Sequence, residues 1–75
     1  MTPNSSYGYS APIERILRFE KSSLGVFLLV KFADGQRSWL PLHVVVELAP
    51  ELANIYLNRF PDLYRYHRLH WKKKN

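Results

Sequence analysis

The 75-residue sequence contains no cysteine and only three glycines. Without cysteine the chain can form neither a disulfide framework nor a thiolate metal site, and an intracellular compartment is favoured. Its glycines form no phosphate-cradling loop. No apolar run approaches the ~20 residues of a membrane-spanning helix, and the polar N-terminal stretch lacks the basic start and apolar segment of a signal peptide. We therefore expect a soluble intracellular domain.

Groups suited to catalysis or metal binding are also scarce. His67 and His70 could share one helical face, but a zinc site requires a third and a fourth ligand. The sequence shows no acid/base pair and no nucleophile beside a base, and the chain is small for a catalytic cleft. We therefore expect no enzymatic activity, no bound metal and no cofactor.

The composition is hydrophobic enough for a core, and the basic residues are concentrated at the C-terminal end. Hydrophobic residues make up 47% of the chain and aromatic residues 15%. A single domain of this size buries roughly 60% of the surface that the unfolded chain exposes. Residues 1–60 hold six basic and five acidic groups, whereas residues 61–75 hold five basic groups and one acidic group. The sequence therefore predicts a nearly neutral domain followed by a basic extension.

Residues 25–41 carry the strongest local signal. An apolar stretch, residues 26–32, is followed by Asp34 and Gly35, and this pair predicts a β-hairpin with a type I′ turn. Residues 36–40 are the expected return strand, with Trp39 as its large anchor, and a proline ends it. The first strand has bulky apolar side chains on both faces, which is typical of a strand covered on both sides. One face would be covered by a helix, and the other by sheet curvature, by the termini or by a partner.

The segments before the hairpin are a polar arm and a strand. Residues 1–12 have no apolar periodicity and are predicted to be disordered, with Tyr7 and Tyr9 as the only groups that a surface could recruit. Residues 13–20 predict a first strand with Ile13, Leu17 and Phe19 on one face, although the apolar spacing also suits a helical turn. A polar turn over residues 21–24 would complete a three-stranded meander.

The segments after the hairpin predict at least one helix. Residues 42–48 fit a single helical turn or an irregular crossover, because valines weaken a helix. Residues 50–60 predict a helix, since Pro50 suits the first helical position and Glu51 its positive end. This helix has two apolar lines: Leu52, Ile55 and Tyr56, and Ala53, Leu57 and Phe60. A flat sheet would bury one apolar line of this helix and leave the other exposed as an interface. A curled sheet would bury both lines.

Residues 61–71 fit either a further helix, begun by Pro61 and Asp62, or an extended arm. Residues 72–75 are expected to fray.

Four motifs, together with the order of these elements, resemble the chromodomain superfamily. The motifs are the I-E-R-I-L of residues 13–17, the L-V-K-F of residues 29–32, the W-L-P of residues 39–41, and a proline before the apolar helix. The resemblance covers residues 13–60. It implies an α+β fold in which a three-stranded antiparallel curved sheet packs against a C-terminal helix. Residues 1–12 would then be an N-terminal arm and residues 61–75 a basic aromatic extension.

Chromodomains bind methylated lysine in a cage of three aromatic side chains. By register with that family, the cage positions fall at Ala11, Phe32 and Gly35, so Phe32 alone is aromatic. An aromatic side chain beside a hairpin more often packs inward as core. A methyl-lysine histone reader is therefore the third hypothesis.

The chain resembles more closely the chromo shadow domain of the heterochromatin protein one family, which lacks the cage. That resemblance implies association through the helix and a groove for short apolar peptides of the P-x-V-x-L kind. Carried over by position, the association contacts are Asn54, Leu57 and Pro61, and the predicted association surface also includes Phe60. The tryptophan that grips the peptide falls at Leu63, with Trp71 as its replacement if residues 61–71 fold differently. Since Asn54 and Pro61 depart from the family pattern, a homodimer, a heterodimer and a monomer all stay open.

The first functional hypothesis is thus a non-catalytic, nuclear protein-protein interaction module of chromatin, acting in heterochromatin or gene silencing. The alternative is a chromatin module that binds nucleic acid through the basic tail, where aromatic side chains alternate with cations. Its candidate contacts are Arg65, Arg68, Lys72, Lys73 and Lys74. A solvated basic end whose aromatic side chains pack back onto the domain is the simpler interpretation.

Overall fold

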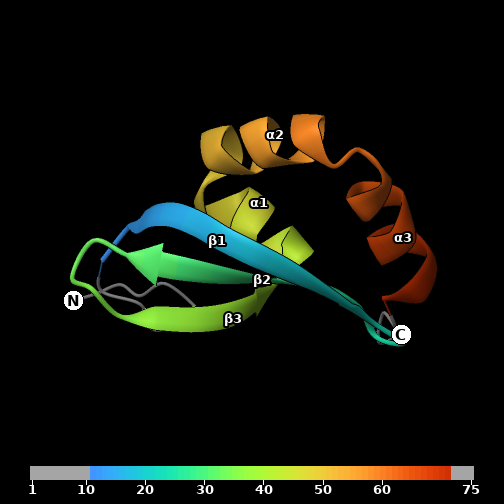
Figure 1. The fold of residues 1–75 in the computed structure, drawn as a ribbon, viewed down its shortest axis with the longest axis horizontal. Helices are drawn as coiled ribbons and strands as arrows, with labels where there is room; N and C mark the ends of the chain where they lie inside the picture. Colours follow the sequence, from blue (N-terminus) through green and yellow to red (C-terminus); the bar gives the residue numbers. More distant parts are fainter. Residues whose placement is uncertain (1–10, 72–75) are drawn as a thin grey trace.

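The computed structural model describes residues 11–71 and has an α+β fold (Figure 1). The strands form one antiparallel sheet in the order β1-β2-β3, and the helices lie together on one face of it. The elements are β1 (Ile13–Ser22), β2 (Gly25–Phe32), β3 (Arg37–Pro41), α1 (Leu42–Leu48), α2 (Pro50–Arg59) and α3 (Asp62–His70). The predicted fold class is confirmed. The disorder expected around Tyr7 and Tyr9 and the fraying of residues 72–75 lie outside the described residues.

Two β-bulges interrupt β1, at Glu14 and Leu17. Each bulge adds one residue and so re-aims the side chains that follow it. Ile13, Ile16 and Phe19 therefore share the face that the helices cover, and they pack on the core from β1. The prediction of a strand is confirmed and the helical turn is wrong, as is the placement of Leu17 on that face. The strand also continues to residue 22, so the turn is shorter than expected.

The β2–β3 hairpin forms where the sequence predicts it, but its turn is of a different type. Gly35 has a φ of +95°, whereas Asp34 has no positive φ, so the predicted type I′ turn is wrong. The Gly35 N–H donates to the Phe32 carbonyl at 2.9 Å, and the Phe32 N–H donates to the Gln36 carbonyl at 2.8 Å. These bonds fit a three-residue loop whose last residue is a left-handed glycine. The Asp34 Oδ1 accepts a hydrogen bond from the Gln36 N–H at 3.1 Å and stabilises the turn.

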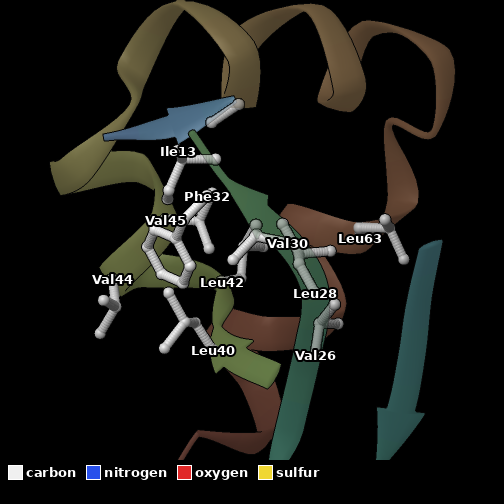
Figure 2. Packing of buried hydrophobic residues seen from close by; sticks show 11 residues of the cluster. Ile13, Val26, Leu28, Val30, Phe32, Leu40, Leu42, Val44, Val45 and Leu63 are labelled. Carbon is white, nitrogen blue, oxygen red and sulfur yellow. The ribbon is translucent and has the colours of Figure 1, made fainter. Parts of the chain in front are cut away.

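The core lies between the sheet and the helices (Figure 2). Along β2, buried residues alternate with half-buried ones, and Val26 and Leu28 are fully enclosed. The buried apolar side chains are Ile13, Val26, Leu28, Val30, Phe32, Leu40, Leu42, Val44, Val45, Ala53 and Leu63. Within residues 11–71, the helices cover only one face of the sheet. The termini and a partner, which could cover the other face of β2, lie outside the described residues, so cover on both faces stays a prediction.

On β3, the exposed fractions of Trp39 and Leu40 contradict the prediction that Trp39 anchors the strand. Trp39 is 38% exposed and lies on the face away from the helices, whereas its neighbour Leu40 is buried. Trp39 is therefore not the core anchor of its strand. Side chains alternate across a strand, so a register in which Leu40 faces the helices turns Trp39 outward.

The helices show where burial outweighs local preference. Residues 42–48 form a regular helix because Val44 and Val45 are enclosed between the sheet and α2, which offsets the low helix propensity of valine. Helix α2 begins at Pro50 as predicted, and it leaves Ile55 exposed. Residues 62–70 form a helix, so the extended arm is wrong. None of the helices in residues 11–71 is long and apolar enough to cross a membrane.

Candidate functional site

Helix α3 is fixed against the end of the sheet by polar contacts. Strand β3 pairs with β2 only as far as Phe27, opposite Pro41, so the Val26 N–H lies beyond the last strand pair. The imidazole of His67 takes the place of the missing strand, because its Nδ1 accepts this N–H at 2.9 Å. The Tyr66 hydroxyl donates to the Ser22 carbonyl at 2.9 Å. These two bonds hold α3 on the β1–β2 hairpin.

The hydrogen bonds of His67 fix its tautomer. The side chain is only 4% exposed, and its Nδ1 carries no proton because it accepts from Val26. The neutral ring therefore has its proton on Nε2, which donates to the Nδ1 of His43 at 3.1 Å. The rings of the pair are stacked, with centroids 5.3 Å apart, and the Trp71 ring lies 4.5 Å from His43. A proton on the Nδ1 of His67 would set its N–H against the N–H of Val26.

Burial lowers the pKa of His67 below its ordinary value of 6.5, and the neighbouring His43 lowers it further. Between the lowered pKa and 6.5, the unfolded chain binds more protons than the folded one, so the free energy of unfolding falls as pH falls. Urea unfolding between about pH 7.5 and about pH 5.5 should show this loss. The variant His67→Asn keeps an acceptor near Nδ1 but does not titrate, so it should be less stable at neutral pH and nearly independent of pH.

The matched control for that experiment is His70→Asn, the same change on the same helix. His70 stacks on Tyr66 with ring centroids 3.9 Å apart and has no bond to the sheet. It should therefore retain the pH dependence of the wild type. An unchanged pH dependence in His67→Asn would show that the proton is taken up elsewhere.

Beside the histidine pair, two neighbouring cavities lie along the three helices. The first, the aromatic end, has a volume of about 460 Å³, and the second, the apolar end, has a volume of about 320 Å³. Tyr64 lines both. The aromatic end is lined by His43, Tyr64, His67, Arg68 and Trp71, and the apolar end by Val46, Pro50, Ala53, Asn54, Leu57 and Tyr64. We call the two together the helical groove.

The structure separates the residues predicted for association. Asn54 and Leu57 line the helical groove, with Asn54 exposed and Leu57 half-buried. Phe60 instead packs on the ring of Phe19 at 5.2 Å, and with Pro61 it borders a different cavity of about 250 Å³ between α2, α3 and β1. Only half of the predicted surface is therefore brought together.

Of the residues predicted to contact a peptide or to form the aromatic cage, two are buried in the core and one lines the helical groove. Leu63 is 2% exposed and belongs to the core, so its side chain is not displayed to a partner (Figure 2). Trp71, its predicted replacement, lines the helical groove. Phe32 is a buried core residue, and its side chain faces the helices with Ile13 opposite it. Phe32 is therefore a core residue, as the simpler interpretation expected, and its ring is not displayed as part of an aromatic cage.

Among the basic tail residues, Arg65 and Arg68 lie exposed on α3, and the Arg68 guanidinium lies 5.9 Å from the Tyr64 ring. The predicted contacts at Lys72, Lys73 and Lys74 lie outside the described residues.

The sequence does not predict the histidine pair, because the spacing of His67 and His70 suggests that these two lie together. The two rings do not meet, because His70 stacks on Tyr66 while His67 turns to the sheet. The partner of His67 lies 24 residues earlier, at a distance that periodicity cannot bridge. Residues 11–71 contain no group of three side chains that could hold a metal ion.

Comparisons with protein-family models, with curated proteins and with solved structures find no match for this chain. The case for a function therefore depends on the sequence motifs, on the fold and on the helical groove.

Proposed function

We propose that the chain is a non-catalytic protein-protein interaction module of nuclear chromatin, which associates through the helical groove and takes a partner peptide there. The motifs that resemble a chromo shadow domain supply the expectation of chromatin, and of heterochromatin or gene silencing. The α+β fold which that resemblance implies is the fold observed. A fold hosts many functions, so the argument for interaction depends on the groove itself.

The observation that carries the proposal is the position of Asn54 and Leu57. The resemblance assigns both to association, and both line the apolar end of the helical groove together with Val46 and Tyr64. Half-buried apolar side chains beside an exposed aromatic ring in a hollow are typical of an interaction site. The amide of Asn54 at its rim would give a partner a hydrogen bond that fixes its position.

The aromatic end of the groove has side chains suited to binding the short apolar partner peptide. Trp71 and Tyr64 offer rings at which an apolar side chain can anchor, and such rings often dominate binding energy. The guanidinium of Arg68 lies in the same cavity and would pair with an acidic group. An apolar segment with an acidic residue is therefore the partner that this end favours.

A lysine at position 54 should prevent association. Asn54→Lys puts an ammonium into the groove, and burying it against the partner is costly, so we expect the dissociation constant to rise at least about tenfold. Sedimentation equilibrium across a range of concentrations would measure this, with the wild type expected to associate. Asn58→Lys adds the same charge on the same helix at an exposed residue that does not line the groove, and it should behave like the wild type.

Leu57→Glu is a second test, with a fold check by circular dichroism because Leu57 also packs on the core. It should dissociate the assembly. A wild type that stays monomeric at every concentration, or equal effects at positions 54 and 58, would contradict association through the groove.

A second candidate function is nucleic-acid binding through α3 and the basic tail. The exposed Arg65 and the Arg68–Tyr64 contact favour it, because a cation beside an exposed ring suits a phosphate and a stacked base. An affinity that does not change with salt would exclude it.

A further inference from the structure

The face of the sheet opposite the helices carries an unusual row of charge. Arg15, Lys31 and Arg37 lie side by side on β1, β2 and β3, because Lys31 pairs with Arg15 on one side and with Arg37 on the other. We call this face of the sheet, the side away from the helices, the open face. Neighbouring strands are ~4.8 Å apart, so the three cationic side chains start close together.

Such a row is unfavourable by itself. Like charges directly opposite each other on adjacent strands destabilise a sheet. Glu14 offsets part of the repulsion from the first bulge of β1, but its Oε1 lies 4.0 Å from the Lys31 Nζ, the outer limit of an ion pair. Cations on edge strands can also prevent sheets from pairing edge to edge, yet that role does not explain Lys31, which lies on the central strand. An anion across the row would relieve the repulsion.

The next pairs along the strands add an aromatic ring. Leu29 lies between Arg18 and Trp39, and the Arg18 guanidinium reaches across to within 5.6 Å of the centroid of the Trp39 ring. Trp39 is 38% exposed even with this contact. It stands two residues from Arg37 on the same face, so a cation and a stacking surface are adjacent along β3.

We propose that the open face binds single-stranded nucleic acid, with phosphates on the Arg15–Lys31–Arg37 row and a base on Trp39. A single strand fits better than a duplex, because base pairing and stacking hide the base faces that Trp39 would contact. This site lies on the opposite side of the sheet from the helices, so it differs from the helical groove and from the nucleic-acid site proposed on α3.

The test is fluorescence anisotropy of the full chain with a labelled oligothymidine or oligouridine of about 12 nucleotides, within the ~4–16 that a small β-domain covers. The logarithm of the binding constant should fall with the logarithm of salt at a slope of about −2, as expected for three phosphate contacts. Arg37→Gln should weaken binding and reduce that slope by about 0.7. Trp39→Ala should weaken binding about tenfold and leave the slope unchanged.

The matched control is Arg59→Gln, which removes the same charge from an exposed position on α2 and should leave affinity and slope nearly unchanged. Equal losses in Arg37→Gln and Arg59→Gln would overturn the proposal, because they would show that only net charge matters. A loss confined to Arg65→Gln and Arg68→Gln would place binding on α3 instead. Equal affinity for a duplex, with no effect of Trp39→Ala, would also overturn it.

Discussion

Replacing Gly25 by alanine is expected to destabilise the domain by about 3 kcal/mol or more. Gly25 has a φ of +127°, where a residue with a side chain is strained by ~1–3 kcal/mol. An added Cβ would also lie 2.7 Å from the Nδ1 and 3.0 Å from the Cε1 of His67. The imidazole would have to move and release the Val26 N–H, and an unsatisfied buried donor costs ~1–3 kcal/mol.

The effect should be visible in any unfolding experiment, because a chain of this length is stable by only about 4–11 kcal/mol. A loss of 3 kcal/mol should lower the Tm by about 12 °C or more. The control is Gly35→Ala, which also places alanine at a positive φ but meets no atom within 4 Å, so backbone strain alone should cost ~1–2 kcal/mol. Equal losses at the two glycines would show that the contact with His67 does not matter.

Truncating Leu63 to alanine should cost about 2–5 kcal/mol, as for other fully buried leucines. The side chain leaves α3 toward Val30 and Leu28 of the central strand, and only 2% of its surface is exposed (Figure 2). Urea unfolding monitored by circular dichroism would measure the loss. The resemblance to a chromo shadow domain instead implied that Leu63 borders the partner peptide. In that role, Leu63→Ala would change the free energy of unfolding only slightly.

Leu69→Ala is the matched control, because Leu69 is on the same helix and is 74% exposed. Its substitution should change stability by no more than about 0.5 kcal/mol. If Leu63→Ala unfolds like the wild type and loses only peptide binding, Leu63 belongs to the partner site and its burial has been assigned the wrong role.

Signals carried by a few adjacent residues predicted the fold well. The Asp34-Gly35 pair located the hairpin and Pro50 located the start of α2, since both depend on backbone geometry that neighbouring residues determine. The bulges of β1 could not be predicted in the same way. They depend on the register with β2, which is decided by packing against α1 and α2 and not by the residues of β1 alone.

The candidate site was harder to predict, for a similar reason. Asn54 and Leu57 share a helical face, so their spacing alone places them together. The remainder of the groove comes from α1 and α3, whose positions depend on burial, and α1 forms despite its valines. Periodicity left residues 61–71 undecided, and only the docking of α3 on the hairpin turned Leu63 into core and Trp71 into a groove residue.

The docking of α3 on the β1–β2 hairpin also has a consequence for the order of folding. The bonds from Tyr66 and His67 join residues 44 and 41 positions apart, whereas the hairpin closes through near neighbours. Contacts so distant in sequence form late, because the chain must first close a long loop. Until α3 docks, the end of β2 that carries Val26 and Leu28 therefore lacks the cover of this helix, and apolar surface exposed during folding favours aggregation.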